Sequence, residues 1–238
     1  MLLANGGIGL ELAAQLMAKG SYHVLGGSRS QDKGNAAIKD LRSRNLVGSA
    51  EFVQLDVTND DSIDRAVADV EKNHGKLDVL VNNAGIGGLG ITPLRRQMLE
   101  CLDTNAVGPA VVTKAFEDLL KKSTAPARIV NVSSGMGSIG QRLDPTSRVK
   151  HIGEGQYRAS KAAMNMVSAS QQVEYAPFGI KVFAYCPGFT VSNLGPYNTS
   201  ENGAKPVADG ATPILDLLDG KRDDDVTKFV HNHGVYPW

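Results

Sequence analysis

The sequence predicts an α/β fold, built as a doubly wound parallel sheet with helices on both faces. Short runs rich in Val and Ile are apolar almost throughout, as in strands buried on both faces of a parallel sheet. Segments with helical periodicity separate these runs, and regular strand–helix alternation is typical of doubly wound sheets. The strand candidates are residues 22–27 (YHVLGG), 51–55 (EFVQL), 77–81 (LDVLV), 127–133 (ARIVNVS) and 180–185 (IKVFAY).

Helices are expected between these strands. After a glycine-rich turn, apolar residues follow the i, i+3, i+4, i+7 spacing of one helix face at Leu10, Ala13, Ala14 and Met17. Residues 59–75 open with capping side chains before a periodic apolar stripe, and residues 206–220 are helical in pattern. Residues 187–206 are rich in Gly, Pro, Asn and Ser, which predicts a long loop of the kind that often covers a site.

The composition describes an ordinary globular protein. The 238 residues suit one domain (1–238), with 42% hydrophobic and 21% charged residues. Lys plus Arg and Asp plus Glu both number 25, so we expect neither a nucleic-acid nor a membrane partner. Two cysteines without CxxC spacing argue against a disulfide framework or a structural zinc, and we expect a cytoplasmic protein without a metal.

Three groups of residues carry candidate chemistry at the predicted carboxyl edge of the sheet, where ligands bind in such folds. The first is the turn Asn5-Gly6-Gly7-Ile8-Gly9, which precedes a helix whose free N–H groups suit a pyrophosphate. The alternative is an ordinary glycine-rich helix start. The turn is therefore a weak signal by itself.

The second group follows the other strands. Ser28 and Arg29 lie where the ribose of a dinucleotide would lie, and they suit a 2′-phosphate better than a free 2′-hydroxyl. The alternative is that Arg29 is a surface charge. Asp56 and residues 82–85 (NNAG) end two more strands at the same edge, and each can also be a turn residue.

The third group is Tyr157 and Lys161, which share one helix face at i, i+4 spacing. A phenol needs a nearby cation to act as an acid/base at neutral pH, and Lys161 supplies one. Ser133 and Ser134, at the end of a predicted strand, offer a hydroxyl to a substrate oxygen. Tyr-x-x-x-Lys pairs are common by chance, so only the combination indicates a site.

In this order, the glycine turn, LDVTN, NNAG, TNAVG, NVSS, YxxxK and PG resemble the short-chain dehydrogenase/reductase superfamily, from Ala4 to about Gly195. The resemblance implies a Rossmann-type enzyme that uses NAD or NADP. It implies that Tyr157 is the general acid/base, that Lys161 lowers its pKa and binds the nicotinamide ribose, and that Ser134 polarises the substrate oxygen. Asn105 would hold a water for proton exchange. Cofactor contacts are expected from Asn5, Gly7, Ile8, Gly9, Ser28, Arg29, Asp56, Val57, Asn83, Ala84, Gly85, Tyr157, Lys161, Pro187, Gly188, Thr190 and Ser192.

Finer features resemble the carbonyl-reductase branch. Arg29 favours NADP(H), and residues 141–155 form an insertion that would border the substrate pocket and favour a monomer, with a homo-oligomer left open. We therefore expect an NADPH-dependent reduction of a small-molecule ketone, aldehyde or quinone to an alcohol. The aromatic residues Tyr236 and Trp238 are expected to pack back on the substrate side. The pair His231 and His233 has no acidic or cysteine partner near in sequence, which argues against a metal site there.

One feature departs from the family pattern. The glycine turn usually reads TGxxxGIG after a central strand, but Leu2 and Leu3 occupy the Thr-Gly slots here. We expect the first strand to be essentially missing, from a shortened gene product or a mispredicted start, and the chain to be of marginal stability. The alternative function is therefore a non-catalytic nucleotide sensor or a non-redox cyclase or isomerase of the same fold.

Overall fold

The computed structural model describes residues 2–3 and 6–238, and within them the strands form a single sheet. The strand order is β3-β2-β1-β4-β5-β6-β7-β8, and all neighbours pair in parallel except β7 and β8, which are antiparallel. The strands are β1 (Leu2–Leu3), β2 (His23–Ser28), β3 (Ser49–Gln54), β4 (Val79–Asn82), β5 (Arg128–Val132), β6 (Lys181–Cys186), β7 (Phe229–His231) and β8 (Gly234–Tyr236).

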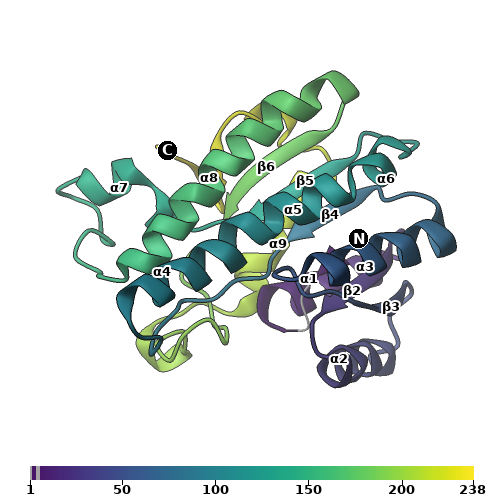
Figure 1. Cartoon of the computed structure of the whole chain (residues 1–238), viewed down its shortest axis with the longest axis horizontal. Coiled ribbons are helices and arrows are strands. Elements are labelled where there is room, and N and C mark those ends of the chain that lie inside the picture. The colour runs from purple at the N-terminus through teal and green to yellow at the C-terminus, as the bar shows by residue number, and fades with distance from the viewer. Residues whose placement is uncertain (1, 4–5) are drawn as a thin grey trace.

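Helices cover both faces of this sheet (Figure 1). The α-helices are α1 (Gly7–Lys19), α2 (Gln31–Ser43), α3 (Asp60–His74), α4 (Leu94–Leu102), α5 (Gly108–Ala115), α6 (Glu117–Lys121), α7 (Ile139–Leu143), α8 (Gly155–Tyr175) and α9 (Val207–Leu218). The shorter elements are the π-helix η1 (Asp103–Val107) and the 3₁₀-helices η2 (Gly135–Gly137), η3 (Ala176–Phe178), η4 (Ser200–Asn202) and η5 (Asp223–Asp225). The predicted fold class is thus confirmed.

Two apolar clusters hold the layers together. One cluster packs α1, α2 and α9 on one face, with Leu16 and Ile214 fully buried between helix and sheet. The other packs α3, α5 and α6 on the opposite face, where Ile63 and Phe116 are buried against the strands. Because a fully buried aliphatic or aromatic side chain contributes ~1.5–3 kcal/mol, these two clusters are the main source of stability.

The central strand is short but present. Leu2 pairs with Leu25 of β2 on one side and with Leu80 of β4 on the other, so β1 lies in the middle of the sheet. A first strand is therefore present at the centre of the sheet, although it has only two residues and was expected to be essentially missing. The chain runs outward from β1 in both directions, and ligands bind where the strand order reverses in this way.

The five predicted strands lie within a few residues of the observed β2 to β6, and the predicted helices at residues 59–75 and 206–220 are α3 and α9. The antiparallel pair β7–β8 was not predicted. Residues 187–206 form the expected loop, which contains η4 and is closed by a bridge between Thr190 and Lys205. Within residues 2–3 and 6–238, no helix has the length and apolarity needed to cross a bilayer.

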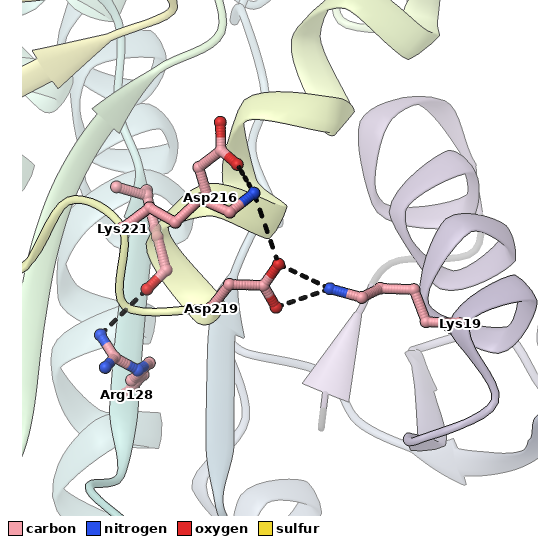
Figure 2. Close-up of polar contacts among 6 residues, drawn as sticks. Lys19, Arg128, Asp216, Asp219 and Lys221 are labelled. Atoms are coloured by element: carbon pink, nitrogen blue, oxygen red, sulfur yellow. Dashed lines mark hydrogen bonds and ion pairs between the residues drawn. The ribbon is translucent and has the colours of Figure 1, made fainter.

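A charged cluster fixes α9 against α1 at the amino ends of the strands. Figure 2 shows Asp219 between Lys19 and Lys221, with Lys19 Nζ 2.6 Å from a carboxylate oxygen. Arg128, at the start of β5, is buried and donates to the Leu217 carbonyl at 3.0 Å and to the Asp223 carboxylate. Exposed ion pairs contribute little, so the buried Arg128 is the member of this cluster that matters for stability.

Candidate active site

A cleft of about 240 Å³ opens at the carboxyl ends of the central strands. Most of the predicted site residues line it: Gly7, Ile8, Asn83, Ala84, Gly85, Ser134, Tyr157, Lys161, Pro187, Gly188, Thr190 and Ser192. Gly6 and Ser133, which belong to two of the candidate motifs, also line it, and the lining residues that the sequence did not single out are Val132, Asn193, Leu194 and Asn198. The structure thus brings residues from five separate segments of the chain to one place.

The first turn of α1 forms one wall of the cleft. Gly7 has a φ of +54°, which only glycine adopts without strain. Among the residues that the structure describes, no side chain caps this helix and its first turn carries no acidic residue, and Gly6, Gly7 and Ile8 bring the positive end of the helix dipole to the cleft. This is the arrangement that binds a pyrophosphate. Gly9 is buried behind this turn, and the predicted contact Asn5 lies outside the described residues.

Tyr157 and Lys161 lie one turn apart near the start of α8, and both are almost fully buried. The Lys161 ammonium donates a 2.8 Å hydrogen bond to the Val132 carbonyl and lies 5.8 Å from the centre of the Tyr157 ring. Burial lowers the pKa of Lys161 to about 8. A lysine with this pKa can exchange a proton near neutral pH.

The Tyr157 phenol has a raised pKa, because burial disfavours the phenolate. A hydrogen bond with the Ser134 hydroxyl lowers the pKa but offsets only part of that rise. Desolvation is the largest influence on this pKa among the described residues, and the lowering by Lys161 that the resemblance implies stays a prediction. A buried phenol with a raised pKa stays protonated at neutral pH.

Ser134 lies at the end of β5, where it caps η2. Its hydroxyl accepts a 3.2 Å hydrogen bond from the Met136 amide, which fixes the hydroxyl beside Tyr157. Two hydroxyls from different elements thus face the same part of the cleft. Together they can bind one carbonyl or alcohol oxygen.

Asn105 lies in the π-helix η1, behind the cleft and without solvent exposure. Its amide oxygen accepts from the Ile86 amide at 2.8 Å, and its amide nitrogen donates to the Ile86 carbonyl and the Ser160 hydroxyl. The side chain therefore joins the loop after β4 to helix α8. π-Helical turns often occur at functional sites, because they re-aim the backbone locally.

The residues expected near the adenosine ribose lie beyond the cleft. Arg29 is exposed at the end of β2, and the neighbouring Ser28 hydroxyl is engaged with the Ser30 backbone at 3.0 Å. The Asp56 carboxylate accepts from the Thr58 amide at 3.0 Å, as in an ordinary Asx turn. Val57 packs beside it, against α5, where a side chain on Gly108 would overlap the Val57 carbonyl.

The C-terminal segment packs on the strand-to-helix connection that follows Ser134. The Ser138 hydroxyl donates to the Pro237 carbonyl at 2.5 Å, and the Gly140 amide donates to the Trp238 carbonyl at 3.1 Å. The Trp238 ring stacks on Phe229 with centroids 5.7 Å apart. The aromatic tail thus packs back on the protein, and its position on the substrate side stays a prediction.

Arg158 organises the insertion at residues 141–155, and the sequence did not single it out. Its buried guanidinium donates to the backbone carbonyls of Met136, Val149, Ile152 and Gly153. Because Arg158 follows Tyr157 directly, α8 carries both the buried phenol and the anchor of the insertion. A lone arginine in a helix has no sequence signal that would reveal this role.

A model of the short chain dehydrogenase family matches residues 4–203. The short-chain dehydrogenase anuI of Penicillium roqueforti is 39% identical over 217 residues, which covers 88% of this chain and 86% of that protein. The structure resembles NADPH-bound carbonyl reductase from chicken fatty liver, with a TM-score of 0.82, 27% identity and coverage of 100% of this chain and 98% of that one. It also resembles the carbonyl reductase Sniffer of Drosophila melanogaster, with a TM-score of 0.80, 26% identity and the same coverage.

Proposed function

Since the chain belongs to the short-chain dehydrogenase family and is carbonyl-reductase-like, we propose that it reduces a small-molecule ketone, aldehyde or quinone to an alcohol with NADPH. The observation that carries this proposal is the shared cleft. The free N-terminus of α1, the Ser134 and Tyr157 hydroxyls and the Lys161 ammonium all line one cavity. Phosphate binding and proton transfer are thereby brought within reach of one extended ligand.

The residues present fit a nicotinamide dinucleotide. Gly7 leaves backbone N–H groups open toward a pyrophosphate. Gly85 has little room for a side chain, because a Cβ there would approach the Asn105 amide oxygen to 3.2 Å. When bound, NADPH supplies the hydride. The residues predicted to flank the nicotinamide line the same cleft: Pro187, Gly188, Thr190 and Ser192.

The chain's own residues handle the proton. Ser134 and Tyr157 hydrogen-bond the substrate oxygen, and Tyr157 donates its proton to that oxygen as negative charge develops there. Lys161, with a pKa of about 8, returns a proton toward the phenol. The raised Tyr157 pKa keeps the phenol protonated before reaction, which is the state that a reduction requires.

The variant Tyr157→Phe tests the proposed acid. It removes one hydroxyl and keeps the ring that packs in the cleft, so kcat should fall by roughly 10²–10⁴ while NADPH affinity changes little. NADPH oxidation with a panel of ketones, aldehydes and quinones measures the first quantity, and a fluorescence titration measures the second. Undiminished turnover by Tyr157→Phe would refute the role.

Cofactor preference is tested at Arg29. The exposed guanidinium at the end of β2 is available to a 2′-phosphate, whereas a carboxylate there would repel it and suit a free 2′-hydroxyl. We expect Arg29→Asp to move the ratio of kcat/KM values from NADPH toward NADH. Arg148→Asp makes the same charge change at an exposed position of the insertion. An unchanged ratio in Arg29→Asp, or an equal shift in Arg148→Asp, would remove Arg29 from this role.

A further inference from the structure

We propose that His23, Glu51 and His74 form a binding site for a divalent transition metal, with Zn²⁺ as the representative ion. One ligand atom from each residue lies within 4.8 Å of the other two. The three residues come from the start of β2, from the middle of β3 and from the last position of α3. This cluster is separate from the cleft, because it lies at the amino ends of the strands.

The sheet register explains why the three side chains meet. His23 pairs with Ser49 and Leu25 pairs with Glu51, and side chains alternate between the faces of a strand. His23 and Glu51 therefore share the face of Leu25, whose side chain packs in the same apolar cluster as α3. The last residue of α3, His74, reaches the other two where this apolar contact ends.

The distances suit a small ion after modest side-chain movement. The Glu51 carboxylate oxygen lies 2.5 Å from His74 Nε2 and 3.6 Å from His23 Nε2. Zn²⁺ binds imidazole nitrogen and carboxylate oxygen at ~2.0–2.2 Å, which separates neighbouring ligand atoms by roughly 3.3–3.5 Å in a tetrahedron. The His23 distance already fits, and His74 has only to retreat by about 1 Å. All three side chains are partly exposed, so they can adjust.

A supporting contact orients one of the imidazoles. His23 Nδ1 lies 2.6 Å from the Ser49 hydroxyl, so a proton on Nδ1 leaves the lone pair of Nε2 directed at Glu51. Metal-bound histidines are commonly held in this way through their second nitrogen. The ring centroids of His23 and His74 are 5.2 Å apart, and both Nε2 atoms approach the same Glu51 carboxylate oxygen.

The donor set determines which ions should bind. Two imidazoles and one carboxylate suit Zn²⁺, Ni²⁺ and Cu²⁺, whereas Mg²⁺ prefers oxygen ligands. Three protein ligands leave the remaining position to water. A bound ion would join β2, β3 and α3, so the free energy of unfolding should rise with the Zn²⁺ concentration.

The test is calorimetric titration of the full chain, without a histidine tag, with Zn²⁺ and separately with Mg²⁺. We expect one Zn²⁺ per chain, no Mg²⁺ binding, and a melting temperature that rises with Zn²⁺ and returns with a chelator. His74→Gln and His23→Gln should each weaken Zn²⁺ binding at least about tenfold, because even the outer partners of metal ligands contribute 10–100-fold. His151→Gln, which removes an exposed histidine elsewhere, should bind as the wild type does.

Ser49→Ala gives a second, milder variant that leaves all three ligands in place. It should weaken Zn²⁺ binding about tenfold through the lost orientation of His23. Absence of saturable Zn²⁺ binding would overturn the proposal and leave an ordinary hydrogen bond between His74 and Glu51. Equal affinity in His74→Gln and the wild type would overturn it as well.

Discussion

Replacing Arg158 of α8 by Met should destabilise the insertion at residues 141–155, which the Arg158 guanidinium holds. Arg158 is only 8% exposed, and its guanidinium donates to four backbone carbonyls, at 3.0–3.2 Å for Met136, Ile152 and Gly153, and also to Val149. Methionine keeps most of the side-chain volume and removes every donor. The change therefore isolates the hydrogen bonds from the packing.

The magnitude follows from what each carbonyl loses. A hydrogen bond contributes ~0.5–1.5 kcal/mol net, and more when one partner is charged. Three of the four carbonyls belong to the exposed end of the insertion and regain water, so we take the lower end and expect a total of about 2–3 kcal/mol. For a chain of this size, that corresponds to a fall in melting temperature of roughly 4–12 °C.

Thermal unfolding and amide hydrogen exchange measure the two consequences. The melting temperature should fall, and protection should be lost first around residues 149–153, which the guanidinium holds. Arg148→Met is the matched control, because Arg148 is an exposed arginine in the same insertion. A melting temperature within 1 °C of the wild type, or an equal loss in Arg148→Met, would refute this account of Arg158.

Lys161→Met should show a pH-dependent effect on stability. The folded pKa of about 8 lies below the ordinary 10.5, so the unfolded chain binds this proton more tightly and wild-type stability rises from about pH 8 to 10.5. The stability of Lys161→Met relative to wild type should therefore fall by ~3 kcal/mol over that window, measured by urea unfolding, and a pH-independent difference would contradict the assignment. Gly88→Ala should lower the free energy of unfolding by about 2–4 kcal/mol, because Gly88 has a φ of +73° and a Cβ would overlap the Cys101 sulfur. Gly179→Ala has a similar φ of +72° but open space, so it should lose only the strain of ~1–2 kcal/mol, and equal losses would exclude the overlap.

The sequence predicts the sheet well where strands are buried on both faces. Residues 127–133 and 180–185 are apolar almost throughout, and β5 and β6 form there. The sequence did not predict the pair β7–β8, because each strand has only three residues and the connection between them is just Asn232 and His233. Its position depends on tertiary packing, in which Phe229 is buried between Tyr236 and Trp238.

The sequence predicts those site residues that lie at the carboxyl edge of the sheet, where the motifs that follow the strands come together. Residues that directly follow a strand, such as Ser134 and Asn83, reach the cleft because parallel strands share their carboxyl edge. Contacts made across the fold have no such signal. The side chain of Asn105 is bound to Ile86 and Ser160, and the pKa of Tyr157 depends on burial, which local spacing does not describe.

The same limit applies to the cluster of His23, Glu51 and His74. Spacings of 28 and 23 residues match no metal-ligand motif, so the sequence predicted no metal. Only the register of β2 with β3 and the length of α3 bring the three side chains together. His231 and His233 are close in sequence, but His231 instead stacks on Tyr236 with ring centroids 4.2 Å apart, and His233 is exposed.

In the proposed reaction, NADPH bound in this cleft supplies a hydride to a carbonyl carbon, and Tyr157 supplies the proton. The most direct measurement is product analysis by mass spectrometry after incubation with NADPH deuterated at the reactive position of nicotinamide. We expect the wild type to form an alcohol that carries one deuterium on carbon, and Tyr157→Phe not to form it. A product without a gain of two hydrogen isotopes, or a carbonyl panel with no NADPH consumption, would contradict it and favour a non-redox or sensor role.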